Sequence, residues 1–271
     1  MSDETTREGR PMPGPEGRPE GRPMPGTEGH GTHTVDVLER SQTPRDGEPQ
    51  SMDRRLFMQL TAYRCPVDRH PRRTAEALGV ALDAAGAVGV IYEDVNDPLG
   101  LALLTWSEDP AEFVDRVRPV LAEERFRSLV FRPEFALLGR TYATGYEDRL
   151  DFWLLEKPVN NVRHPDWPWA VWYPLRRTGE FSRLPPKDQG GILREHAVIG
   201  RAYGEAGLAF DVRLACHGLD QHDNDFVIGL IGKTLHPLSH VVQTMRKTRQ
   251  TSEFIEQMGP FFVGRRIWTS Q

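Results

Sequence analysis

Hydrophobic and polar positions from Met52 onward recur with the periods of strands and helices. Residues 55–63 alternate as in a half-buried strand, and Pro71 opens a stretch with helical spacing. Two apolar runs then flank the turn Val95–Pro98, as in a pair of strands. The elements predicted for the first half are strands at Arg55–Tyr63, Ala87–Asp94, Leu99–Ser107 and Phe135–Tyr146, with helices from Pro71 and from Asp109 to about Glu124.

The second half repeats the same order of elements. Its predicted strands are Ala170–Leu175, Phe210–His217, Phe226–Ile231 and Phe261–Ile267, and its predicted helices run from Pro185 to about Tyr203 and from Pro237 to about Arg249. Each half therefore has the order βαββαβ, that of a ferredoxin-like unit. The fold class predicted is α+β, with two ferredoxin-like repeats, 51–160 and 161–271, forming a dimeric α+β barrel within one chain. Helices would cover the outside, and a ligand could lie on one half's sheet.

Residues 1–50 have a different composition. The segment GRPMPG occurs at Gly9–Gly14 and again at Gly21–Gly26, and large apolar residues are scarce around it. Such a segment buries too little surface to offset the entropy of ordering it. We therefore expect a disordered, Pro/Gly-rich leader at 1–50.

The net charge and the hydropathy of the chain limit the kinds of partner that it is expected to bind. The net charge of −5 favours neither a nucleic-acid nor an anionic-membrane partner. No apolar run approaches about 18 residues, so no membrane span is expected. The first ten residues lack the apolar core of a signal peptide. The two cysteines, Cys65 and Cys216, are far apart and suit free thiols in a reducing compartment, so a cytoplasmic location is expected.

The segment 172–204 carries the most distinctive chemistry. Tyr173 stands at a strand end, Arg176 and Arg177 follow it, and His196 lies on the next predicted helix. Imidazole is a good ligand of iron, arginines can bind the propionates of a porphyrin, and a tyrosine can form a radical. A histidine on a helix is more often a surface or core residue, and paired arginines are usually solvated. From these residue types alone, haem binding is one candidate among several.

The same segment resembles the chlorite dismutase family, and within it the coproheme decarboxylases of bacterial haem synthesis. The resemblance covers about residues 52–271. Its motifs are Tyr173-Pro174-Leu175-Arg176-Arg177, Glu180-Phe181, Leu184-Pro185-Pro186, Glu195-His196 with Ile199-Gly200-Arg201, and Gly259-Pro260-Phe261-Phe262-Val263-Gly264-Arg265, with a looser match at Gly139-Arg140-Thr141-Tyr142. The family is built from paired ferredoxin-like units, as the element order predicts.

The resemblance implies a role for each matching residue. His196 corresponds to the protein ligand of the porphyrin iron, and Tyr173 to the tyrosine that becomes a radical in the decarboxylases. Arg177 and Ser252 correspond to residues that contact propionates. Pro174, Leu175 and Arg176 are implied to lie beside the porphyrin. The residue on the other side of the iron is either Asp211 or Arg213, which fall on one face of the same predicted strand.

Two activities of the family compete. The resemblance implies that chlorite dismutases hold their ligand histidine with a glutamate, at the position that Ile231 occupies here, and have an aliphatic residue in place of Tyr173. Both departures favour a coproheme decarboxylase. Such an enzyme uses hydrogen peroxide to remove two propionate carboxyl groups from iron coproporphyrin III, leaving haem b.

Other functions use the same residues. The alternatives are a chlorite dismutase or other haem peroxidase-like enzyme, a non-catalytic haem carrier or sensor, and a haem-free protein that shares only the scaffold. The resemblance also implies a homo-oligomer, often a pentamer.

Overall fold

The computed structural model describes residues 35–45 and 48–271, and the chain divides into two units, 1–36 and 37–271. All the helices and strands described below belong to the second unit. The prediction of disorder at 1–34 and at 46–47 lies outside the described residues.

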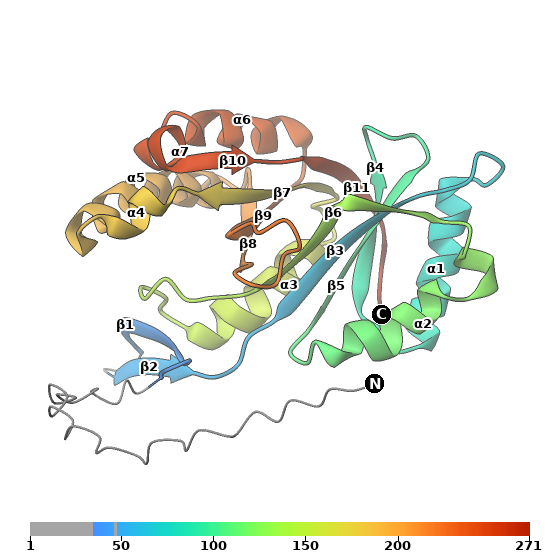
Figure 1. Ribbon diagram of the computed structural model, residues 1–271, viewed down its shortest axis with the longest axis horizontal. Helices are drawn as coiled ribbons and strands as arrows, with labels where there is room; N and C mark the ends of the chain where they lie inside the picture. The colour runs from blue at the N-terminus through green and yellow to red at the C-terminus, as the bar shows by residue number, and fades with distance from the viewer. Residues whose placement is uncertain (1–34, 46–47) are drawn as a thin grey trace, which may run out of the picture. The chain divides into compact units, whose positions relative to one another are not determined.

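The first ferredoxin-like half of the second unit follows the predicted order (Figure 1). Its strands are β3 (Phe57–Arg64), β4 (Gly89–Asp94), β5 (Gly100–Ser107) and β6 (Val130–Arg140). Its helical segments are α1 (Pro71–Ala84), η1 (Phe113–Val117), α2 (Arg118–Leu121) and η2 (Glu124–Phe126). The connection to the second half contains a helix that the hydrophobic pattern did not predict, formed by η3 (Phe152–Glu156) and α3 (Lys157–Arg163).

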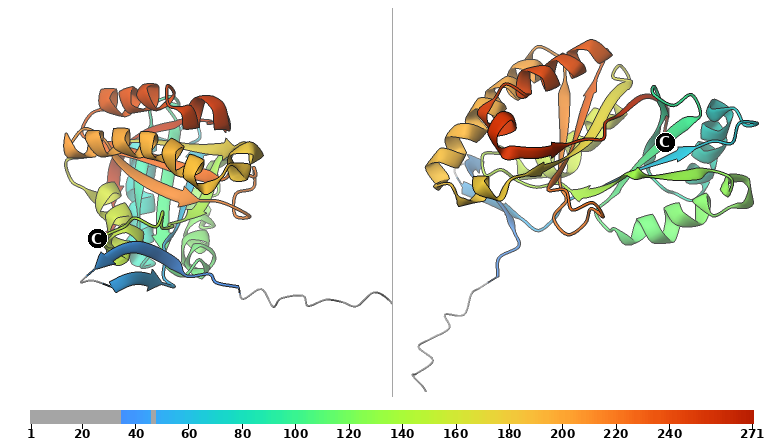
Figure 2. Two further views of the ribbon diagram at one scale, coloured as in Figure 1. Left: turned by 90° about the vertical axis from the view of Figure 1, so that its left-hand side faces the viewer. Right: turned by 45° about the horizontal axis from the view of Figure 1, so that its top comes forward.

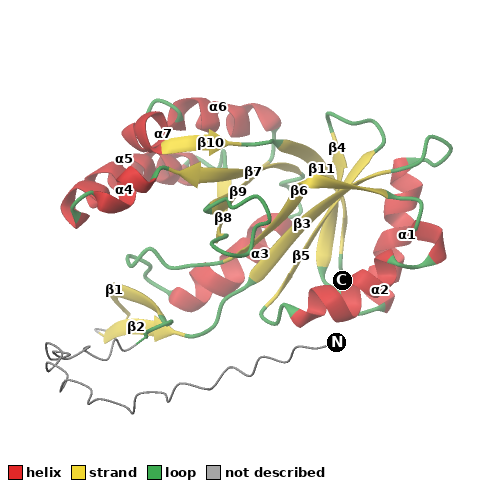
Figure 3. Cartoon of the chain, in the orientation of Figure 1, coloured by secondary structure: helices red, strands yellow, loops and turns green. Residues whose placement is uncertain are grey.

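The second half repeats the arrangement, with additional short elements. Its strands are β7 (Trp169–Arg177), β8 (Phe210–Ala215), β9 (Phe226–Gly232), β10 (Ile255–Met258) and β11 (Phe262–Thr269). Its helices are α4 (Gly179–Arg183), α5 (Pro186–Glu205), α6 (Leu235–Met245) and α7 (Arg249–Phe254). Figure 3 shows α5 and α6 beside β7, β8 and β9, and α1 and α2 beside the strands of the first half.

The strands close into a barrel. Their order is β10-β7-β11-β4-β5-β3-β6-β8-β9, and β9 pairs back onto β7. Counted along the chain, the strands of each half lie side by side in the order second, third, first, fourth. This order is β4-β5-β3-β6 in the first half and β8-β9-β7-β11 in the second, so the two halves have a pseudo-twofold arrangement. The fourth strand of each half joins the second strand of the other, and the β6–β8 joint consists of the single pair Arg140–Ala215. The predicted pair of ferredoxin-like units forming one barrel is confirmed.

Side chains that alternate along β7 separate the barrel interior from its outer face. Trp172 is fully buried in the large apolar cluster that fills the barrel, whereas Tyr173 belongs to a second cluster under α5 and α6. The interior is tightly filled, because a Cβ at Gly229, the partner of Trp172 on β9, would lie 2.5 Å from the indole ring. A third cluster packs α1 and α2 on the first half. The outer face of the second half is therefore a separate layer, and Figure 2 shows α5 and α6 along it.

Several boundaries differ from the predictions. The strand predicted at Phe135–Tyr146 begins at Val130 and ends at Arg140. It ends there because the Glu147 carboxylate accepts hydrogen bonds from the N–H groups of Thr144, Gly145 and Tyr146, which ties residues 144–147 into a loop. The helix predicted to reach Arg249 ends at Met245, and α7 begins at Arg249.

The predicted disordered leader, residues 1–50, extends too far toward the C-terminus. The hairpin of β1 (Glu39–Arg45) and β2 (Glu48–Met52) begins inside residues 1–50 and belongs to the second unit. Polar contacts hold it: Ser41 Oγ donates to Glu147 O at 2.6 Å, and Gln50 Oε1 accepts from the N–H of Leu150 at 3.0 Å. Hydrogen bonds of this kind leave no hydrophobic pattern in the sequence. As for membranes, no helix among the described residues is long and apolar enough to cross one.

Deleting residues 1–36 should leave the melting temperature of the remaining chain unchanged, whereas deleting residues 1–52 should lower it. The longer deletion removes at least two buried or half-buried hydrogen bonds, worth about 1 kcal/mol each. For a domain of this size that corresponds to a loss of about 4–8 °C. Calorimetry of both deletions makes the comparison, and equal melting temperatures would mean that the hairpin contributes nothing.

Candidate functional site

Three neighbouring strands present a row of side chains on the outer face of the second half. Arg213 on β8 pairs with Ile228 on β9, and Ile228 pairs with Tyr173 on β7. Because strand residues alternate between faces, Asp211 and Leu230 lie in the next row on the same face. The strand register thus brings together three residues predicted from the sequence, Tyr173, Asp211 and Arg213.

Tyr173 is set into apolar surroundings. Its side chain is 6% exposed and stacks on Phe261, with ring centroids 4.6 Å apart. Burial raises the pKa of its phenol well above the ordinary value, so the hydroxyl keeps its proton at neutral pH. No hydrogen bond of this hydroxyl is present among the described residues, which leaves the O–H available to a ligand.

His196 lies on α5, which packs loosely over this face. Only Ile192 is buried among the helix's 20 residues, while His196, Ile199 and Tyr203 remain half-buried. Nδ1 of His196 is buried without a hydrogen-bond partner. Burial lowers the pKa of the imidazole, and the positive charges of Arg177 and Arg213 act in the same direction. The ring is therefore neutral at neutral pH, the state in which imidazole binds a metal.

Arg177 stands at the end of β7, between two aromatic rings. Its guanidinium carbon lies 4.3 Å from the centroid of Phe181 and 4.9 Å from that of Phe226. The backbone N–H of Arg177 donates to Asp225 Oδ2 at 2.7 Å, whereas its Nε is buried without a partner. A guanidinium held by aromatic rings, with a buried N–H left over, is suited to bind an anionic group.

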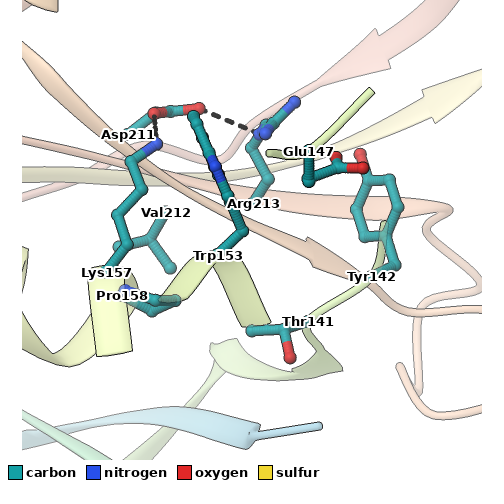
Figure 4. Close-up of a pocket in the computed structure, with 9 residues that line it drawn as sticks. All are labelled: Thr141, Tyr142, Glu147, Trp153, Lys157, Pro158, Asp211, Val212 and Arg213. Carbon is teal, nitrogen blue, oxygen red and sulfur yellow. Dashed lines mark hydrogen bonds and ion pairs between the residues drawn. The ribbon is translucent and has the colours of Figure 1, made fainter. Parts of the chain in front are cut away.

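Figure 4 shows a small cavity that adjoins the row at β8. Asp211 lies between two cations: Lys157 Nζ donates to Asp211 Oδ1 at 2.6 Å, and Arg213 Nε lies 2.9 Å from Asp211 Oδ2. Burial alone would raise the pKa of Asp211, but these two positive charges and the hydrogen bond from Lys157 lower it to about 2. The side chains of Asp211 and Arg213 keep 38% and 34% of their surface exposed, so they border open space.

Other predicted site residues lie elsewhere. Arg176 faces away from Tyr173 along β7, and its Nε donates to Asp223 O at 2.8 Å. Pro174 also has the opposite orientation from Tyr173, by the same alternation. Ser252 is exposed on α7 and donates to Thr248 O at 2.9 Å, and the described contacts do not connect it with Tyr173 or His196.

One position inferred from the resemblance was wrong. Ile231 belongs to the cluster inside the barrel, so it does not face α5. The residues of β9 on the face toward α5 include Phe226, Ile228 and Leu230, all apolar. The conclusion drawn from Ile231 is unchanged, because the described chain offers no carboxylate within hydrogen-bonding distance of His196 Nδ1.

The sequence prediction missed Lys157 and Tyr142. Lys157 escaped notice because the connecting helix was not predicted. Tyr142 was assigned to a strand, but it lies in the loop after β6, with its ring centroid 5.6 Å from that of Phe226. Its phenol is close enough to Arg177 and Arg213 for their charges to act on its pKa, which burial raises. A helical period across residues 153–161 was the only available signal for Lys157.

Comparisons with known proteins agree with this architecture. The signature of the chlorite dismutase family matches residues 104–267, more than half of the chain. A heme-binding protein from Thermus thermophilus superposes with a TM-score of 0.62 at 18% identity, covering 80% of this chain and 92% of that one. Chlorite dismutase from Candidatus Nitrospira defluvii, in complex with imidazole, gives a TM-score of 0.61 at 12% identity, covering 80% and 93%. No curated protein matches the chain by sequence.

The closed barrel of two ferredoxin-like halves, with helices on its outer faces, defines a dimeric α+β barrel protein. Because the family signature covers residues 104–267, more than half of the chain, the chain belongs to the chlorite dismutase family.

Replacing Asp211 with Asn should lower the melting temperature at neutral pH, with a difference that shrinks as the pH falls. The pKa of Asp211 is about 2 in the folded protein, against 3.8 for an ordinary aspartate. Because folding lowers this pKa, the ionised carboxylate stabilises the fold above about pH 4 and loses that contribution as the pH falls toward 2. Asp115→Asn, at an exposed position of the other half, is the control. A difference that stays constant down to about pH 3 would contradict the ion pairs.

Proposed function

We propose that this protein binds an iron porphyrin between α5 and the outer face of the second half, with His196 as the protein ligand of the iron. The observation that carries the proposal is the position of His196, on a loosely packed helix over the face that presents Tyr173 and Arg213. The name of the Thermus thermophilus relative, a heme-binding protein, supports it.

The residues fit such a group. The apolar side chains of Ile199, Phe226 and Ile228 face this layer yet remain half-buried, so a flat apolar ring would cover them. The buried Nδ1 of His196 lacks a partner, and the ring is neutral. Among the described residues no group of three metal-ligating side chains occurs, so a metal here would bring other ligands with it, as a porphyrin iron does.

Arg177 is the proposed anchor of a propionate. Its buried Nε lacks a partner, and Phe181 and Phe226 fix the plane of its guanidinium. Leu175, on the same face as Tyr173, supplies apolar contact beside it. Arg213 is the proposed residue opposite His196, because Lys157 already neutralises Asp211. A propionate contact of Ser252 stays a prediction.

The porphyrin that we propose as substrate is iron coproporphyrin III, converted to haem b with hydrogen peroxide. Each round takes one propionic acid and one peroxide to one vinyl group, one carbon dioxide and two waters. The bound iron supplies the reaction with peroxide. The protein fixes the propionates, excludes water and supplies an oxidisable side chain.

Tyr173 is the proposed oxidisable group. The oxidant derived from peroxide would take a hydrogen atom from the phenol, and the resulting tyrosyl radical would take one from the propionate, which restores the phenol. Transfer of one further electron from the substrate radical to the same oxidant would accompany release of carbon dioxide and formation of the vinyl group. Its burial and its stacking on Phe261 hold the protonated hydroxyl in an apolar setting. A chlorite dismutase is favoured less, because His196 Nδ1 lacks the carboxylate partner that raises the basicity of a ligand imidazole. The pentamer implied by the resemblance and the cytoplasmic location inferred from the cysteines stay predictions.

Adding coproheme to the purified protein should give a Soret band that His196→Ala weakens and shifts while the melting temperature of the apo-protein stays near that of the wild type. The imidazole is half-buried, and its buried Nδ1 has no hydrogen bond to lose. Titration followed by absorbance gives both affinities. Identical spectra for wild type and variant would remove His196 from the site.

Tyr173→Phe should bind coproheme almost as tightly as the wild type and fail to decarboxylate it. Phenylalanine keeps the ring that stacks on Phe261 and loses only the O–H. The measurement is a peroxide titration read by mass spectrometry for the loss of two carboxyl groups. Tyr146→Phe, at a tyrosine that is 81% exposed, is the matched control and should turn over normally.

Turnover by the Tyr173 variant would contradict the radical role and revive the chlorite-type alternative. Binding without turnover in the wild type itself would identify a haem carrier or sensor.

A further inference from the structure

The helix that joins the two halves reaches the proposed porphyrin site with residues spaced four apart. Trp153, Lys157 and Asn161 lie four residues apart along η3 and α3, so they fall on one side of the helix. Two of them bind the same residue of β8: Asn161 Nδ2 donates to Asp211 O at 2.9 Å, and Lys157 Nζ donates to Asp211 Oδ1 at 2.6 Å. The helix therefore holds both the backbone and the side chain of Asp211.

Arg213 is placed by the same group. Its Nε lies 2.9 Å from Asp211 Oδ2, and its guanidinium carbon lies 5.9 Å from the centroid of the Trp153 ring. Lys157 Nζ lies 4.1 Å from that centroid, so one indole contacts both cations. Among the described residues, the guanidinium forms the ion pair with Asp211 and no hydrogen bond of good geometry. Its N–H donors remain available to a ligand on the row with Tyr173.

We propose that Lys157 is a positioning residue, which holds Asp211 and thereby fixes Arg213 at the porphyrin site. This inference rests on the proposed function. Two cations share the carboxylate of Asp211, and Glu147 lines the same cavity. Asp211 is the anchor of Arg213 and a poor proton acceptor, since a carboxylate that remains ionised far below neutral pH is a weak base. The connection between the halves thus takes part in the site.

Fluoride affinity of the ferric haem b complex tests the proposal, because an anion bound at the iron would accept a hydrogen bond from Arg213. Arg213→Met removes the guanidinium and gives the fluoride affinity expected when that hydrogen bond is lost completely. Lys157→Met should weaken fluoride binding about tenfold, the lower range for a charge-assisted hydrogen bond. Lys157→Arg keeps the cation and should retain most of the affinity.

The double variant Lys157→Met/Asp211→Asn separates positioning from stability. It removes both partners together and leaves the net charge of the cluster unchanged, so the melting temperature of the apo-protein should recover relative to either single variant. Arg213 loses its anchor, so fluoride binding should stay weak. If a single variant fails to fold, the fluoride affinity of the double variant still tests the proposal.

Wild-type fluoride affinity in the double variant, or in Lys157→Met, would overturn the positioning role. The proposed function has a separate readout, namely the Soret band that depends on His196. If that band forms in the wild type and fluoride binding ignores Lys157, only this inference fails. If the band does not depend on His196, the porphyrin site itself is wrong.

Discussion

The pairing of β7 with strands on both of its edges determines where the rest of the site can lie. β7 bonds to β11 on one side and to β9 on the other, which closes the barrel. Because the barrel is closed, successive side chains of β7 point alternately into the barrel interior and toward its outer face. Trp172 fills the interior against Gly229, so Tyr173 must face outward, and a slip of one residue would exchange them. The orientation of the tyrosine is thus a consequence of packing the tryptophan.

The outer layer of the second half is held together differently from the interior. Large apolar side chains such as Trp172 fill the barrel, whereas α5 covers its sheet loosely and has Ile192 as its one buried residue. In this outer layer, polar atoms of His196 and Arg177 are buried without partners. Unpartnered buried polar atoms are costly in a folded protein. The proposed porphyrin would offset part of that cost, because one of its propionates would supply the missing partner of Arg177. The same half of the barrel therefore combines a fixed framework with an incompletely packed ligand layer.

Much of this could be predicted from the sequence, for reasons that lie in particular residues. Apolar alternation in Arg55–Tyr63 and the apolar run Ala170–Leu175 predicted strands, and the repeated order of elements predicted the barrel. Tyr173 and His196 stood in motifs with fixed spacing. The hairpin of β1 and β2 and the loop around Glu147 could not be found this way, since backbone and carboxylate hydrogen bonds hold them. Lys157 was missed because its role depends on a contact 54 residues away in the chain. The resemblance implied that Pro174 and Arg176 lie beside the porphyrin with Tyr173, whereas alternation along β7 turns their side chains to the opposite face.

A crystal structure of the protein with coproheme bound tests the central claim most directly. The account predicts that the porphyrin lies between α5 and the row formed by Tyr173, Ile228 and Arg213, with a nitrogen of His196 coordinated to the iron and Arg177 in contact with a propionate. A porphyrin bound on another surface, or an iron in this layer with no bond to His196, would contradict it.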